Sequence, residues 1–162
     1  MISCRRKARE AALQALYQCD ALGEWSLACI DLYFQQFQSE GALEGESQEH
    51  TGFARMIIDG VISNFDFIDS QISAASKHWS LPRMCRVDRN LLRLAVYEIG
   101  FVPDIPVSVT INEAIEIAKR YCGDDAPMFV NGVLDNIATT FASDPLLKSK
   151  VFQKELKKAA NS

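Results

Sequence analysis

The sequence lacks the features of a membrane or exported protein. Its 162 residues contain no run of 18 uncharged apolar residues, so we expect no transmembrane helix. The basic start, MISCRRKARE, leads into no long apolar segment, and a signal peptide is therefore not expected. Hydrophobic residues make up 48% of the chain and charged residues 23%, which is typical of folded globular proteins. These absences predict a cytoplasmic protein that does not enter a membrane.

Groups that hold metals or perform catalysis are also scarce. The five cysteines form no CxxC pair, and His50 and His78 stand far from any ligand-like spacing, which argues against a zinc site. Scattered thiols of this kind are expected to be reduced and packed as small hydrophobic groups. Glu113 and Glu116 have no neighbouring histidine, cysteine or glycine-rich loop that would complete an acid–base site. We therefore predict no enzymatic activity and no cofactor.

Apolar residues recur at helical spacing along most of the chain, while β alternation does not persist. This pattern predicts an all-α fold. The predicted helices cover residues 4–22, 27–37 with Ser26 as N-cap, 53–72 and 89–99. Two further helices lie on either side of a Gly-Asp-Asp-Ala-Pro turn at 123–127, and a lysine-rich segment follows at the C-terminus. We predict a division into a helical domain, 1–143, and a basic extension, 144–162.

Other local signals predict helix ends and loops. The glycine-rich, acidic stretch 39–51 is expected to be a long loop. Asp88 can cap the helix that follows it, and Gly100 is expected to end that helix in a left-handed conformation. Asp144 before a proline predicts a further cap. Trp79 and Leu81 are expected to close over the core.

Charge is distributed unevenly. The first nine residues have a net charge of +4 and residues 144–162 a net charge of +3, which leaves −11 on the residues between them. The N-terminal cations are Arg5, Arg6, Lys7 and Arg9. Because positive charge at a helix N-terminus opposes the helix dipole, contact with phosphate explains this cluster better than helix stability does. A solvated terminus is the alternative.

Two further groups are candidates for a binding surface. Tyr17 lies two turns after the cluster, with Gln14 near the edge of the same face, and its ring could stack an unpaired base or pack in the core. Tyr121, Asp125 and Phe129 surround the acidic turn. Asp125 could instead cap a helix, and Phe129 could be a core aromatic. Aromatic and polar groups together favour binding over catalysis.

Three blocks of this sequence resemble one family in the same order. They are RRKAREAALQALYQ near the start, VDRNLLRLAVYEIG at 87–100, and INEAIEIAK followed by FVNGVLDNIA. Together they resemble the NusB family of transcription antitermination factors. The resemblance implies a bundle of about seven helices in two antiparallel halves, with the lysine-rich helix as an addition. Met128 departs from the family pattern, because many members have a lysine there.

The resemblance also implies a function and a site. It implies an antitermination factor that binds boxA-type single-stranded RNA of nascent ribosomal transcripts, with the ribosomal protein NusE, on elongating RNA polymerase. The implied RNA-binding residues are Arg5, Arg6, Lys7, Arg9, Gln14, Tyr17, Asp88, Tyr121, Asp125 and Phe129. Two alternatives remain, namely the N-terminal module of an rRNA cytosine-5 methyltransferase and a helical adaptor that binds only protein. A homodimer is also open.

Overall fold

All regular structure in the described part of the chain is helical. The computed structural model describes residues 4–39, 48–144, 146–147, 157 and 160–161. The helices follow in the order α1 Cys4–Leu22, α2 Leu27–Ser39, α3 Gln48–Ser63, α4 Phe65–Ala75, the short 3-10 helix η1 Leu81–Arg83, α5 Arg86–Phe101, α6 Val107–Tyr121 and α7 Ala126–Ser143. The predicted all-α fold is confirmed. Within these residues, no helix is both long and apolar enough to span a membrane.

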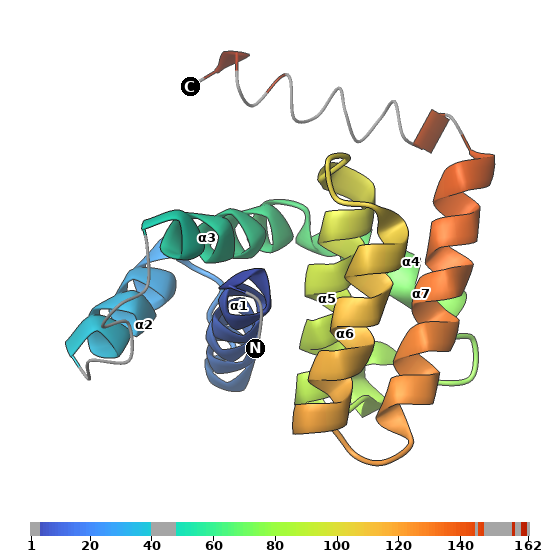
Figure 1. Ribbon diagram of the computed structural model, residues 1–162, viewed down its shortest axis with the longest axis horizontal. Coiled ribbons are helices and arrows are strands. Elements are labelled where there is room, and N and C mark those ends of the chain that lie inside the picture. Colours follow the sequence, from blue (N-terminus) through green and yellow to red (C-terminus); the bar gives the residue numbers. More distant parts are fainter. Residues whose placement is uncertain (1–3, 40–47, 145, 148–156, 158–159, 162) are drawn as a thin grey trace.

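The helices form two halves that share one core. Figure 1 shows α1, α2 and α3 in one half, and α5, α6 and α7 side by side in the other with α4 behind them. α5 contacts α1, α3, α4, α6 and α7, and residues 90–98 of this helix are all buried. A helix that is buried on every side has the position of a central core element. α1 packs against both α3 and α5 and thereby joins the two halves.

The structure divides the helix that was predicted over residues 53–72. Buried Asn64 lies between α3 and α4, and its side-chain nitrogen donates a hydrogen bond to the carbonyl oxygen of Gly60 at 2.9 Å. The same carbonyl also accepts the backbone N–H of Asn64 at 3.1 Å, so the side chain adds a second hydrogen bond at the end of α3. Beyond it, Phe65 packs on Trp25 with 4.6 Å between ring centroids. Apolar residues keep their helical spacing across the break, so periodicity alone indicated one helix.

Three other expectations about local structure were wrong. Gly100 lies inside α5, and only Gly23, at +66°, has a positive φ among the described residues. A Cβ on Gly100 would lie 3.3 Å from the Phe141 ring, so packing explains this glycine. Asp88 is in the first turn of α5, whose N-cap position is Cys85. α3 begins at Gln48 and so includes the last four residues of the predicted loop.

The predictions about the segments outside the main helices were confirmed in some places and wrong in others. Residues 40–47 and most of the lysine-rich segment lie outside the described residues. The predicted cap at Asp144 is confirmed, because its Oδ1 accepts hydrogen bonds from the N–H groups of Leu146 and Leu147 at 2.9 and 3.1 Å. Leu81 packs against the core as expected. Trp79 does not, since 56% of it is exposed.

Gly60 allows the closest approach between α3 and α5. A Cβ at this position would lie 2.1 Å from two ring atoms of Tyr97, and Tyr97 itself stacks on Phe101 at 5.2 Å. No side chain larger than a hydrogen atom fits there unless the tyrosine ring moves. The glycine is therefore required by interhelical packing.

We predict that Gly60→Ala destabilises the fold by about 1–3 kcal/mol, because an added methyl group overpacks the contact with Tyr97. Gly132→Ala in α7 is the matched control, since a Cβ added at Gly132 would meet nothing within 4 Å. Alanine there should stabilise the helix by up to about 1 kcal/mol. Urea unfolding of both variants measures the difference. Equal stability of the two variants would contradict the packing argument.

Candidate nucleic-acid interface

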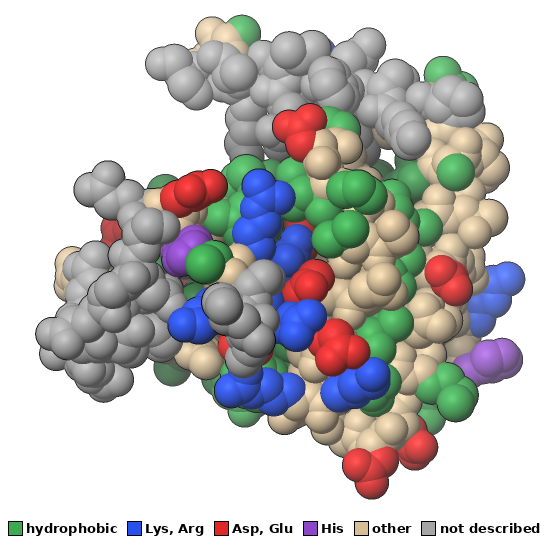
Figure 2. Space-filling model, in the orientation of Figure 1, with side chains coloured by type: hydrophobic (Ala, Val, Ile, Leu, Met, Phe, Trp, Pro, Cys, Tyr) green, Lys and Arg blue, Asp and Glu red, His purple; other side chains and the backbone are tan. Residues whose placement is uncertain are grey.

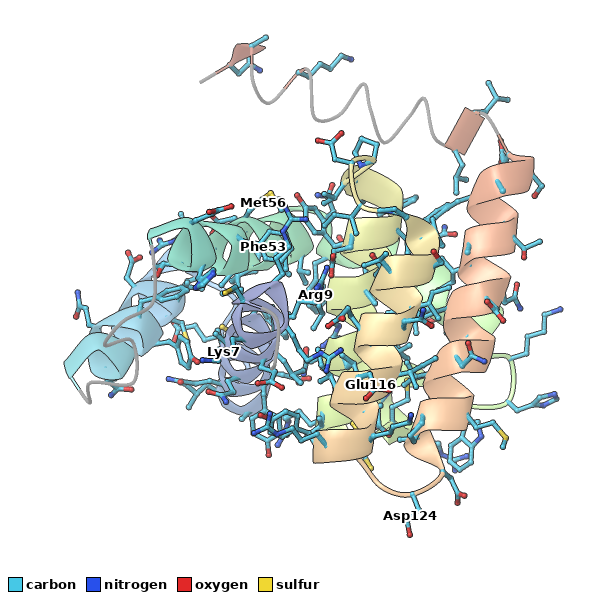
Figure 3. The ribbon with its side chains drawn as sticks, viewed as in Figure 1. Lys7, Arg9, Phe53, Met56, Glu116 and Asp124 are labelled. Carbon is cyan, nitrogen blue, oxygen red and sulfur yellow. The ribbon has the colours of Figure 1, made fainter. Side chains whose placement is uncertain are left out.

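The four N-terminal cations point in different directions from α1. Arg5 and Lys7 are exposed, Arg6 is partly buried, and only 2% of Arg9 is exposed. Successive residues on a helix are separated by about 100°, so a run of cations cannot face one surface. Figure 3 shows Arg9 in the space between α1 and the helices of the other half. Figure 2 shows lysine and arginine side chains gathered around α1, with acidic side chains among them.

Arg9 forms a buried ion pair with Glu98 of α5. Its Nη2 and Nε donate to the two carboxylate oxygens at 2.7 and 2.8 Å, and Glu98 is completely buried. The guanidinium carbon also lies 5.4 Å from the ring centroid of Phe53 in α3. The sequence predicted that Arg9 faces RNA, whereas the structure directs it inward. Its contact with RNA stays a prediction that would require this pair to open.

Arg6 is also paired within the protein. It donates to both carboxylate oxygens of Glu113 in α6, at 2.7 and 2.9 Å. The hydrogen bonds from Arg6 hold the pKa of Glu113 below its ordinary value, against an opposing effect of burial. Arg120 of α6 adds a third link, at 3.3 Å from Glu10. Together with the Arg9 pair, these contacts join α1 to α5 and α6.

Three of the predicted site residues line one groove, which we call the tyrosine groove. It has a volume of about 180 Å³ and is lined by Glu10, Leu13, Gln14, Tyr17, Val87 and Tyr121. Tyr17 is 40% exposed and Tyr121 41% exposed, so neither ring is packed in the core. The hydroxyl of Tyr33 donates to Oε1 of Gln14 at 3.1 Å, and this hydrogen bond fixes the position of the Gln14 side chain. Exposed rings in a groove suit base stacking.

Three more predicted residues line a second groove, the tryptophan groove. Its volume is about 310 Å³, and its lining residues are Trp79, Arg83, Met84, Cys85, Asp88, Asp125, Ala126 and Phe129. Both grooves are lined in part by the first turn of α5, with Val87 in the tyrosine groove and Asp88 in the tryptophan groove. The structure thus places six of the predicted residues in grooves, three in each, and each groove draws on more than one segment of the sequence.

The two carboxylates of the tryptophan groove are not used as helix caps. Asp125 occupies the N-cap position of α7, but its side chain makes no capping hydrogen bond, so the capping alternative was wrong. Asp88 is near the thiol of Cys122. Burial first, and then a hydrogen bond with Asp88, raise the pKa of Cys122 to about 12. Both carboxylates are therefore placed to accept hydrogen bonds from a ligand in the groove.

Sequence reasoning missed three residues at these grooves. Trp79 and Arg83 line the tryptophan groove, and the guanidinium carbon of Arg86 lies 5.8 Å from the ring centroid of Tyr17. The available signal was their position just before the block VDRNLLRLAVYEIG, together with their charge or aromatic character. Met128, which departs from the family pattern, lies beside Phe129 and is 83% exposed.

The described residues contain no candidate metal site. Among the described residues, no group of three or more histidine, cysteine, aspartate or glutamate side chains could hold a metal ion. The five cysteines are free thiols, and the Sγ atoms of buried Cys19 and Cys29 lie 3.7 Å apart. Recognition of a ligand by stacking, charge and hydrogen bonds is what the grooves can perform.

Comparison with protein families matches residues 6–139 to the NusB family. The chain belongs to this family. It is 47% identical over 141 residues to the transcription antitermination protein NusB of Citrifermentans bemidjiense, covering 86% of this chain and 97% of that protein. It is 42% identical to the same protein of Pelotomaculum thermopropionicum, covering 82% and 88%. These names describe transcription factors and support the prediction that the chain is not an enzyme.

Solved structures agree with the sequence comparison. T. maritima NusB superimposes with a TM-score of 0.72 at 42% identity, covering 86% of this chain and 93% of that chain. A complex described as antitermination factors NusB and NusE with double-stranded RNA matches with a TM-score of 0.72 at 28% identity, covering 86% and 99%. The predicted NusB-like architecture is confirmed.

We predict that Glu98→Gln destabilises the fold by about 3–5 kcal/mol, because buried Arg9 loses its direct partner. The carboxylate that remains near it, that of Glu113, lies 3.9 Å away and is already paired with Arg6. The double variant Arg9→Met with Glu98→Leu removes both charges and should recover most of that loss. Arg55→Met breaks an exposed ion pair with Asp31 and should cost less than about 1 kcal/mol. Thermal and urea unfolding measure all three. A loss in Glu98→Gln as small as that in Arg55→Met would show that the buried pair contributes little.

Proposed function

We propose that this protein is an RNA-binding transcription antitermination factor that recognises boxA-type single-stranded RNA of nascent ribosomal transcripts together with NusE. The observation that carries the proposal is the pair of grooves, in which exposed aromatic rings and carboxylates that cap no helix are found. The helix that lines the tyrosine groove, α1, also carries exposed cations at its start. Membership of the NusB family supports it, as does the related complex that contains NusE and RNA.

Each groove offers contacts that suit unpaired bases. The rings of Tyr17 and Tyr121 can stack on bases of any sequence, and such stacking requires bases that are not already in a duplex. Carboxylates such as those of Asp88 and Asp125 accept hydrogen bonds from exocyclic amino groups, which gives the tryptophan groove a preference among bases. The related complex holds double-stranded RNA, but exposed stacking rings favour a single strand here.

The basic end of α1 supplies the phosphate contacts in this proposal. Arg5 and Lys7 are the two cations of the cluster that are exposed, and we assign the contacts to them. Arg6 and Arg9 are held by Glu113 and Glu98 and serve chiefly to position α1. The mechanism is recognition without chemistry, since cations hold the backbone while rings and carboxylates engage the bases.

The partner assignments extend the same proposal. NusE would bind beside the RNA and add contacts to an incomplete site, and the assembly would act on elongating RNA polymerase in the cytoplasm. Without NusE, the surface reserved for it could support a homodimer. The basic extension 144–162 lies beyond the family match, which ends at residue 139, and its separation as a domain stays a prediction.

We predict that NusE and boxA-type RNA bind this protein cooperatively. If NusE adds contacts to the RNA, it must tighten RNA binding by a given factor, and RNA must tighten NusE binding by the same factor. Titration of fluorescent boxA-type RNA with and without NusE measures one side, and calorimetry of NusE binding with and without RNA measures the other. Independent binding of the two ligands would overturn the joint site, and no RNA binding at all would favour a protein-only adaptor.

We predict that Arg5→Ala with Lys7→Ala flattens the dependence of log affinity on log salt by roughly 1.4 units, about 0.7 for each lost phosphate contact on a single strand. Over a fourfold rise in salt, the double variant should therefore lose about sevenfold less affinity than the parent. Folding should be unchanged or slightly improved, because positive charge at the start of a helix is unfavourable.

Lys77→Ala is the charge control for this experiment. Lys77 is exposed and lies in the turn after α4, outside the basic start of α1. Its removal should leave the salt slope at the parental value. A parental slope in a folded Arg5→Ala, Lys7→Ala protein would remove the N-terminus of α1 from the RNA site.

A further inference from the structure

Arg86, the first residue of α5, is an additional candidate for RNA contact. We propose that it binds the phosphate of the nucleotide whose base stacks on Tyr17. This inference rests on the proposed RNA-binding function and extends it to a residue that neither the N-terminal cluster nor the acidic turn includes. Three observations carry it: the surplus of positive charge around Asp20, the position of Arg86 over Tyr17, and a third groove that continues beyond it.

The charges around Asp20 leave Arg86 as the surplus cation. Asp20 accepts hydrogen bonds from Arg89 at 2.6 Å through both of its oxygens, from Asn90 at 2.7 Å and from Arg93 at 3.2 Å. Arg93 is also paired with Asp69 at 2.8 Å. Arg86 comes only to 3.8 Å of Asp20. Three guanidinium groups thus share two carboxylates, and the one held most weakly is Arg86.

The accessibility of these groups supports the same assignment. The side chain of Arg86 is 42% exposed, against 15% for Arg89 and 7% for Arg93. Arg89 and Arg93 are therefore structural members of a buried network, while Arg86 reaches solvent. A cation at the start of α5 also opposes the dipole of that helix, so helix stability does not explain it.

Arg86 lies where two grooves meet. Its guanidinium carbon is 5.8 Å from the ring centroid of Tyr17, which lines the tyrosine groove. Arg86 itself lines a third groove of about 700 Å³, together with Asp20, Trp25, Phe65, Asp69, Ser73, Ser80, Leu81, Pro82, Arg89 and Arg93. Because the guanidinium lies over one face of the Tyr17 ring, a base would stack on the face that remains open, and the phosphate of that nucleotide would meet Arg86 at the edge of the ring. Arginine binds phosphate with two parallel hydrogen bonds and is well suited to that position.

The substitution Arg86→Gln tests the assignment in the full-length protein. It should weaken binding of boxA-type RNA by roughly 10- to 150-fold, the loss typical of one hydrogen bond to a charged group. It should also flatten the salt slope by about 0.7 units, because one phosphate contact is lost. The fold should be retained, since Asp20 keeps Arg89, Asn90 and Arg93 as partners. Arg86→Lys retains the charge and should keep the parental slope.

Arg55→Gln provides the matched control. Arg55 is similarly exposed, at 37%, and is paired with Asp31, but it lines none of the three grooves. Its substitution should leave RNA affinity and the salt slope unchanged. In a Tyr17→Ala background, the effect of Arg86→Gln should shrink, because two residues that hold the same nucleotide are energetically coupled.

The outcomes distinguish this inference from the proposed function. If Arg86→Gln retains parental affinity and slope while Tyr17→Ala weakens binding, the RNA site stands and the assignment of Arg86 is overturned. Equal losses in Arg86→Gln and Arg55→Gln would also overturn it, because they would reflect net charge alone. Absence of RNA binding by the parental protein, with or without NusE, would overturn both.

Discussion

The buried ion pair between Arg9 and Glu98 is the constraint on which the rest of the structure depends. It joins the first helix to the central helix across 89 residues of sequence, in a position where neither charge can be solvated. Unpaired, either group would be costly to bury, so the pair forms only when α1 and α5 adopt one relative position. That position fixes which side of α1 remains exposed. It also places Gln14 and Tyr17 opposite Val87 and Tyr121, which creates the tyrosine groove.

A second polar cluster plays the same part at the other end of α1. Asp20 receives hydrogen bonds from Arg89, Asn90 and Arg93, and these bonds outweigh the effect of burial and keep its pKa below the ordinary value. A carboxyl group with a lowered pKa stabilises the folded state above its unfolded pKa, and this contribution is lost as the pH falls through the folded value. α1 is thus held to α5 at both ends. Near its start the carboxylate is that of Glu98 in α5, and near its end it is that of Asp20 in α1 itself.

The sequence was sufficient for what depends on local pattern. Periodicity predicted the helices. The residues chosen around the acidic turn lie at two grooves, with Tyr121 in the tyrosine groove and Asp125 and Phe129 in the tryptophan groove. What it could not show depends on partners distant in the chain. Arg9 faces inward because Glu98 is there, and no local signal separates it from Lys7. The break at Asn64 was hidden because apolar spacing continues through it, and Trp79 was assigned to the core because a large apolar residue usually lies there.

The alternation of directions along the first turns of α1 has a consequence for genetic studies of the protein. Neighbouring positions in one basic run are therefore under different kinds of selection. Arg9 is constrained by its buried partner Glu98, whereas exposed Lys7 is constrained by the ligand that we propose it contacts. Defects at Arg9 should appear as reduced abundance in the cell, because an unstable protein is degraded. Defects at Lys7 should leave abundance normal. A survey that scores growth alone would merge the two, and one that also measures protein level would separate architecture from recognition within a single helical turn.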